Sequence, residues 1–225
     1  MSSAAGSIAA TLSIIHSSDP LLKTANNVWG GNRAGYALLD FLAARGALEK
    51  VRVLGLGSGQ GPLELTAAAL GAHVLATDLP VALSLLRANA AANADIIAKG
   101  GGSFQVASLP WGEDELPADV VCQGPFSIVL ASDCIFWPEL FAPLIATFSA
   151  VSNAQKEAPP HIFFALEPRS PREAIFFIEL ERAGFAYAKI DEVFAPQLDA
   201  LISGAVAVFW AQKLRPQTLP ESGSV

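Results

Sequence analysis

The feature that most restricts the fold is a run in which every second residue is glycine. Gly55, Gly57, Gly59 and Gly61 alternate through Val53–Pro62, at the end of an apolar stretch and directly before a Leu/Ala-rich helical pattern. Glycine at a strand-to-helix turn lets the backbone bend sharply and approach a ligand closely, because no Cβ is in the way. Open α/β sheets bind ligands beyond the carboxyl ends of their strands. The run therefore predicts such a sheet with a ligand site at its first turn.

The rest of the chain alternates short apolar runs with helical patterns. Strands are expected at Val51–Leu56, Ala72–Thr77, Ser103–Val106, Phe126–Ser132, His161–Leu166, Phe185–Ile190 and Ala205–Ala211. Helices are expected at Arg33–Ala44, Pro62–Leu70, Leu79–Ala92, Glu139–Phe148 and Arg172–Ala183. This order predicts one doubly wound, mostly parallel, seven-stranded α/β sheet (Rossmann-like) with helices on both faces. The last two runs lack a clear helix between them, so the last strand is expected to be antiparallel.

Composition fits one domain with a large core, since 52% of the 225 residues are hydrophobic. We expect a mobile N-terminal segment over 1–20, a folded domain over 21–213 and a flexible tail over 214–225. The net charge is −7, and no run of Lys or Arg is present, which argues against nucleic-acid binding. No uncharged apolar run reaches membrane-spanning length, and no signal peptide is evident. We therefore expect a cytoplasmic or nuclear monomer that does not bind membranes.

Cysteine and histidine are scarce and scattered. Cys122 and Cys134 form no CxxC pair, and the three histidines show no metal-ligand spacing. We expect reduced cysteines and no metal site.

The spacing of the glycines indicates the class of ligand. A dinucleotide fingerprint needs a small residue where Gln60 stands, and a P-loop needs a Gly-Lys-Ser/Thr that is absent here. The G-x-G-x-G pattern is typical of methyltransferases that bind a nucleoside without a pyrophosphate. Asp78 ends the next strand, where a carboxylate can accept both ribose hydroxyls. Gly55, Gly57, Ser58, Gly59 and Asp78 are the predicted binding residues; a ligand-free turn, with Asp78 capping the following helix, is the alternative.

Four landmarks carry a resemblance to a known family. They are the Gly loop with Asp78, Val28-Trp29-Gly30, Leu109-Pro110-Trp111-Gly112 and Ser132-Asp133-Cys134-Ile135-Phe136. Together they resemble the seven-strand (class I) S-adenosylmethionine-dependent methyltransferases, close to the methyltransferase-like 21 family of non-histone protein-lysine methyltransferases. The resemblance spans roughly Val28 to Ala211. The last landmark is like the family's D-x-x-Y/F motif, and its aromatic residue is Phe136, so any role that needs a phenolic hydroxyl is lost. Glu167-Pro168-Arg169 matches the family only loosely.

The resemblance implies the cofactor, the reaction and the site. S-adenosyl-L-methionine would donate a methyl group to a lysine side chain of a protein. Trp29, Trp111 and Ser132 would join the glycine loop in binding the cofactor, and Trp111 would lie beside the adenine. Asp133 would orient the amine without acting as the sole base, and Phe136 would stack on the incoming cation.

Other interpretations stay open for single residues. Trp29 and Trp111 could be core aromatics, Asp133 could cap a helix that starts at Pro138, and Phe136 with Trp137 could plug the sheet. They stay open for function too: a methyltransferase for a small molecule or another side chain, a nicotinamide-dependent oxidoreductase, or a catalytically silent binding module.

Overall fold

The computed structural model describes residues 4–19, 22, 31–168, 170–190 and 206–215. Its centre is a seven-stranded sheet in the order β3-β2-β1-β4-β5-β7-β6. The strands are β1 (Arg52–Leu56), β2 (His73–Asp78), β3 (Ser103–Ser108), β4 (Ile128–Ser132), β5 (His161–Leu166), β6 (Phe185–Lys189) and β7 (Ala207–Lys213). The first five strands pair in parallel, and β7 is antiparallel to both β5 and β6. The predicted doubly wound sheet with an antiparallel last strand is confirmed.

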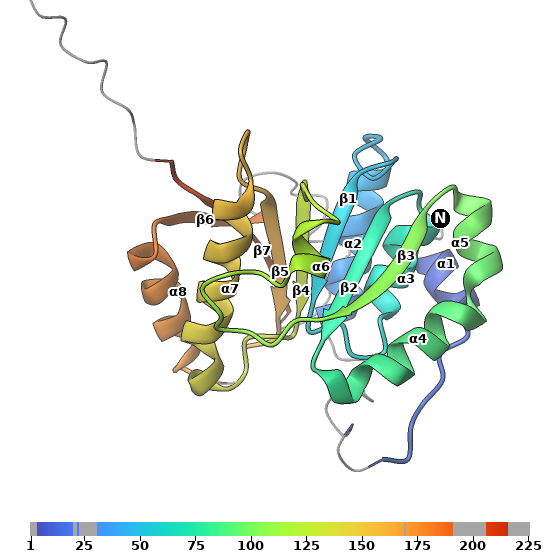
Figure 1. Cartoon of the computed structure of the whole chain (residues 1–225), viewed down its shortest axis with the longest axis horizontal. Helices are drawn as coiled ribbons and strands as arrows, with labels where there is room; N and C mark the ends of the chain where they lie inside the picture. The colour runs from blue at the N-terminus through green and yellow to red at the C-terminus, as the bar shows by residue number, and fades with distance from the viewer. Residues whose placement is uncertain (1–3, 20–21, 23–30, 169, 191–205, 216–225) are drawn as a thin grey trace, which may run out of the picture.

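Helices cover both faces of this sheet (Figure 1). They are α1 (Ala4–Thr11), α2 (Gly31–Ala43), α3 (Pro62–Ala69), α4 (Leu83–Ala92), α5 (Ala94–Gly100), α6 (Ala118–Val121), α7 (Phe141–Ala154) and α8 (Glu173–Arg182), with 3₁₀ turns η2 (Pro80–Ala82) and η3 (Pro138–Leu140). The sequence did not predict α1, α5 and α6. Part of the helix expected from Leu79 is the η2 turn. The expected β-run 205–211 and the loop 191–203 lie partly or wholly outside the described residues.

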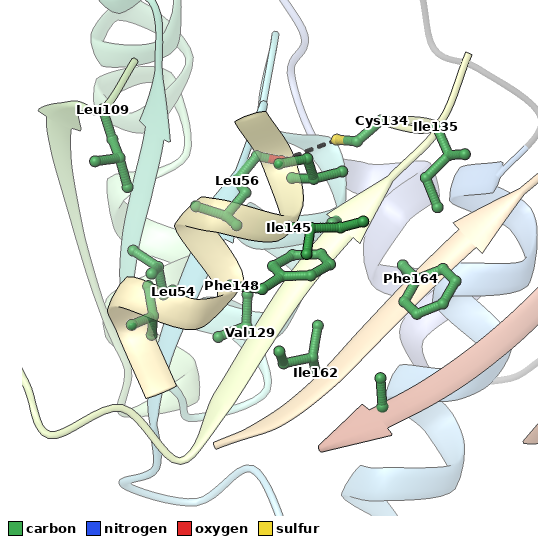
Figure 2. Packing of buried hydrophobic residues seen from close by; sticks show 14 of the residues in the cluster. Leu54, Leu56, Leu109, Val129, Cys134, Ile135, Ile145, Phe148, Ile162 and Phe164 are labelled. Atoms are coloured by element: carbon green, nitrogen blue, oxygen red, sulfur yellow. Dashed lines mark hydrogen bonds between the residues drawn. The ribbon is translucent and has the colours of Figure 1, made fainter. Parts of the chain in front are cut away.

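Alternation along the strands sorts the core into two clusters. Val53 and Val74 point to the face covered by α2 and α3, whereas Leu54 and Leu75 point to the other face. Figure 2 shows the second cluster, where Phe148 of α7 is directed toward the side chains of the central strands. Both faces of the parallel strands are therefore buried, which explains why their sequences lack polar alternation.

Strand order reverses between β1 and β4. β1 pairs with β2 on one side and with β4 on the other, so the connections from β1 and from β4 lead away in opposite directions. Because these strands are parallel, their carboxyl ends all lie at the same end of the sheet. This is the switch point where doubly wound sheets bind ligands.

Residues 4–19, within the segment 1–20 that the sequence predicts to be mobile, pack onto the domain. Ala5 is fully buried, and its backbone N–H donates to Asp40 Oδ1 at 2.7 Å. Ser13 exchanges two hydrogen bonds with the Asn93 side chain, each 2.9 Å long. The Ala/Ser-rich sequence carries no periodic signal for this docking, because side-chain amides of α4 provide the partners.

Candidate active site

The glycine loop closes β1 and leads into α3. Gly57, Gly59 and Gly61 have φ angles of 61°, 56° and 80°, a region that favours glycine. A Cβ placed on Gly57 would lie 2.9 Å from Trp111 and 3.0 Å from Cys134 Sγ. The loop therefore needs glycine both for its backbone angles and for its close neighbours.

Asp78 faces this loop from the end of β2. Its Oδ2 accepts the backbone N–H of Gly59 at 2.7 Å, and its Oδ1 accepts the N–H of Leu79 at 2.7 Å. Burial raises the pKa of Asp78, and these two backbone bonds partly oppose the rise. Asp78 does not cap the following helix, because the η2 turn begins after Leu79 and neither η2 nor α4 has a side-chain capping bond. Each carboxylate oxygen keeps a second lone pair that can accept a further hydrogen bond.

The tip of β4 holds the next pair of predicted residues. Asp133 is buried with φ 55°, and its N–H donates to Ala165 O at 2.8 Å. Its Oδ2 accepts the N–H of Gly31 at 2.6 Å, which places a carboxylate at the start of α2. The alternative in which Asp133 caps a helix at Pro138 is wrong, because Trp137 precedes that turn and gives it no side-chain bond. Ser132 Oγ is buried beside Gly31 without a hydrogen bond to any described residue.

The predicted aromatic residues differ in where they lie relative to the glycine loop. Trp111 is half-buried against Gly57, as its close approach to that glycine shows. Phe136 is half-buried and packs on Trp137 with ring centroids 4.8 Å apart, and Trp137 is 56% exposed. Trp29 lies outside the described residues. The structure thus brings Trp111 to the glycine loop and leaves an aromatic pair just past Asp133.

Two residues near the loop were not predicted. Glu64 lies in the first turn of α3 and is buried; burial, with a smaller effect of the Asp78 charge, raises its pKa to about 7. His16 Nδ1 lies 2.8 Å from Gln60 Nε2, so the N-terminal segment touches the loop. The sequence held a signal for Glu64 alone: it is the single charged residue in the apolar pattern of Pro62–Leu70.

A separate hollow lies near the opposite edge of the sheet. It has a volume of about 390 Å³, and most of its lining is apolar, including Leu38, Phe41, Phe163 and Trp210. Ser127 and His161, at the amino ends of β4 and β5, also line it. It is therefore distinct from the site at the carboxyl ends.

Within the described ranges, no group of His, Cys, Asp and Glu side chains could hold a metal ion. No helix there is long and apolar enough to cross a membrane. The site consists of a glycine loop, carboxylates and aromatic side chains.

The glycine loop lies at the switch point of a parallel sheet, and an acid lies on the neighbouring strand tip. Together these features define a nucleoside-binding α/β protein. A family model described as "lysine methyltransferase" matches residues 11–183, and the chain belongs to that family.

Curated relatives agree with the family. The chain is 32% identical to protein N-lysine methyltransferase METTL21A of Danio rerio over 60% of this chain and 58% of that protein. It is 32% identical to EEF1A lysine methyltransferase 3 of Mus musculus over 60% of this chain and 54% of that protein. The aligned part is thus little more than half of each relative. The predicted resemblance to the methyltransferase-like 21 group is confirmed.

Solved structures share the fold. Magnesium protoporphyrin IX methyltransferase from Synechocystis, with bound S-adenosylmethionine, superposes with a TM-score of 0.55 at 18% identity, covering 89% of this chain and 87% of that one. A TehB-like S-adenosylmethionine-dependent methyltransferase from Corynebacterium glutamicum gives 0.52 at 14% identity, covering 86% and 92%. These likenesses support the architecture.

Proposed function

We propose that this protein is an S-adenosylmethionine-dependent methyltransferase that modifies a lysine side chain of a non-histone protein. One observation carries the proposal: Asp78 on β2 is hydrogen-bonded to Gly59 of the loop that closes β1, at the switch point of the sheet. Membership of the lysine methyltransferase family and the lysine-modifying names of the relatives support the choice of substrate.

The residues at the switch point fit the cofactor. Gly55, Gly57 and Gly59 leave backbone without side chains at the turn, so an adenosyl group can approach closely. Asp78 would accept the ribose hydroxyls, and Trp111 would lie beside the adenine. Ser58 and Ser132 have buried hydroxyls near the loop and the β4 tip that could serve the methionine end. Trp29 would complete this set. When bound, the cofactor supplies a methyl group on a positively charged sulfur.

The chain's own residues must deliver a neutral amine in line with that methyl group. A lysine has a pKa of about 10.4 in water, and an apolar entrance lowers it by desolvation. Phe136 and exposed Trp137 would form this entrance and attract the lysine cation through their ring faces. Asp133 would orient the amine, and its bond to Gly31 would hold the start of α2 beside it.

The experiment that tests this function uses labelled S-adenosylmethionine and a cell lysate. We expect label on lysine in a protein fraction. Label confined to small solutes would overturn the protein substrate, and no transfer despite cofactor binding would favour the silent binding module. A thermal-shift comparison with NAD addresses the oxidoreductase alternative.

Variants test the site assignment. Gly57→Val and Asp78→Ala should abolish measurable cofactor binding by calorimetry, whereas Asp114→Ala, at an exposed acid in the loop after β3, should bind normally. Asp133→Ala should lose transfer while keeping most of the cofactor affinity. Equal loss of both by Asp133→Ala would make that residue part of the cofactor site or of the scaffold.

Partners and location follow from the same proposal. We expect a protein substrate, a monomeric enzyme and cytoplasmic or nuclear localisation, with no nucleic-acid or membrane partner. Sedimentation of the purified chain and imaging of the tagged protein in cells check these expectations.

A further inference from the structure

Glu64 occupies an unusual place beneath the glycine loop. All eight residues of α3 are buried, and Glu64 is the ionisable one among them. A Cβ built on Gly55 would lie 2.5 Å from Glu64 Cγ and 2.8 Å from Glu64 Oε1. The missing side chain of Gly55 therefore makes the room in which this carboxyl sits, against the carboxyl end of β1.

The surroundings of Glu64 carry no compensating charge. Ser58 Oγ is 2.8 Å from the same point on Gly55, and the Ser58 hydroxyl together with the backbone N–H of Glu64 partly opposes the rise that burial causes in the pKa of Glu64. Asp78 adds a negative charge from β2. None of the described Lys, Arg or His side chains forms an ion pair with Glu64, which is not true of most buried carboxylates. Glu64 therefore has no cationic partner among the described residues.

Two further ionisable groups, one on α2 and one after β4, interact electrostatically with Glu64. Tyr36 of α2 has its pKa raised to about 12 by burial and by Glu64. Cys134, after β4, has its pKa raised by burial, then by Asp78, Glu64 and Asp133. Neither group changes its charge near neutral pH. His16 contacts Gln60 of the loop, so it serves as a control position.

Burial sets the protonation of Glu64. Its pKa of about 7 means that close to half of the empty molecules carry the proton at neutral pH. A cation nearby favours the charged carboxylate and lowers that pKa. The methyl donor carries a sulfonium and an ammonium against one carboxylate, a net charge of +1. The product is a neutral thioether with net charge 0.

We propose that Glu64 senses the charge on the cofactor's sulfur: it releases its proton to solvent when the sulfonium donor binds, and it regains a proton when only the thioether product remains. Glu64 then acts through the field at the loop as a positioning residue that favours donor over product. This inference depends on the proposed methyltransferase function.

Calorimetry of the two ligands between pH 6 and pH 8, in buffers of different ionisation enthalpy, tests the proposal. We expect about half a proton to leave per S-adenosylmethionine bound at pH 7, and affinity to be about tenfold higher at pH 8 than at pH 6. S-adenosylhomocysteine should release far less and change affinity by less than about twofold.

Matched variants identify the group. Glu64→Gln keeps the shape but cannot ionise, so it should remove the proton release and the pH dependence for the donor. His16→Asn and Tyr36→Phe should leave both intact. Proton release that survives Glu64→Gln, or that is equal for donor and product, overturns the inference while the methyltransferase function stands. No binding of either ligand to the native chain overturns both.

Discussion

The two faces of the sheet are built from different residues. The face under α2 and α3 is packed mainly by Ala, Leu and Val, with no fully buried aromatic ring among its described members, and it holds the buried Glu64. The face under α7 and α8 is filled by phenylalanine rings with centroids 5.4–6.5 Å apart, such as Phe148, Phe164 and Phe176. Small residues let backbone and polar groups approach a ligand, whereas large rings bury the most apolar surface. The buried carboxyl and the packed phenylalanine rings thus lie on different faces, while Trp111 and Cys134 connect the aromatic face to the glycine loop.

The largest effect should come from the aromatic face. Phe164 is 1% exposed and packs against Phe148, Phe176 and Phe209. Phe164→Ala should lower the free energy of unfolding by about 3–5 kcal/mol because of the lost burial and the cavity left behind. Chemical denaturation measures this, and cofactor affinity at low temperature should be nearly unchanged. Ile175→Ala, at a 45% exposed position on α8, is the control and should change little. If Phe164→Ala lost cofactor affinity as well as stability, cofactor binding would depend on the aromatic packing.

The next effect concerns Glu64, on the face under α2 and α3. Here the substitution should raise the free energy of unfolding instead of lowering it. The folded pKa of Glu64 is about 7, above the ordinary 4.5, so its stability contribution is complete below pH 4.5 and is lost as pH rises through 7. Glu64→Gln should therefore stabilise the empty protein by on the order of 3 kcal/mol at pH 8. The gain should shrink below about 1 kcal/mol at pH 5. Denaturation at both pH values measures it, and an equal gain at both would contradict the raised pKa.

A smaller effect is expected where the N-terminal segment docks. Asn93→Ala removes both bonds to the backbone of exposed Ser13 and should cost about 0.5–1.5 kcal/mol, because water can replace the lost partner. Hydrogen exchange at the Ser13 amide, which should become faster, measures the loss. Hydrogen exchange in α7 and α8, which cover the aromatic face, should stay slow. That result would confirm that the N-terminal docking and the aromatic packing respond independently.

The smallest stability change belongs to the surface. Trp137→Ala, at a 56% exposed position, should alter the free energy of unfolding by no more than about 0.5 kcal/mol. It should nonetheless weaken transfer to the protein substrate, which a methylation assay measures. Trp137→Phe is the control that keeps an aromatic ring. Wild-type transfer by Trp137→Ala would remove this residue from the entrance.

The fold was largely predictable because its signals are local. Buried parallel strands read as unbroken apolar runs, and all seven expected runs correspond to strands, although β7 reaches Lys213, two residues beyond the expected end. The sequence does not predict the docking of residues 4–19, because it depends on Asn89 and Asn93, which lie 74 and 80 residues beyond their partners Ile15 and Ser13. Amide side chains on a helix give no sign in sequence of which backbone they will bind.

The site was predictable in part. The pairing of Gly59 with Asp78 follows from adjacent strand tips, since β1 and β2 are neighbours in both sequence and space. The bond between Asp133 and Gly31 could not be foreseen, because it links residues 102 positions apart through a strained φ. A lone acid in a helical pattern usually faces solvent, so the sequence does not place Glu64 at the site. Only the tertiary packing shows that Gly55 leaves room for its carboxyl group.

Asn89 joins three parts of the molecule, since its side chain bonds both Gln60 O in the loop and the backbone of Ile15. The docked N-terminal segment and the ligand loop therefore share one side chain, so a change in the docking of Ile15 would be felt at Gln60. The same connection offers a reporter: a fluorophore placed at exposed Ser18 should register loop occupancy without touching the ligand.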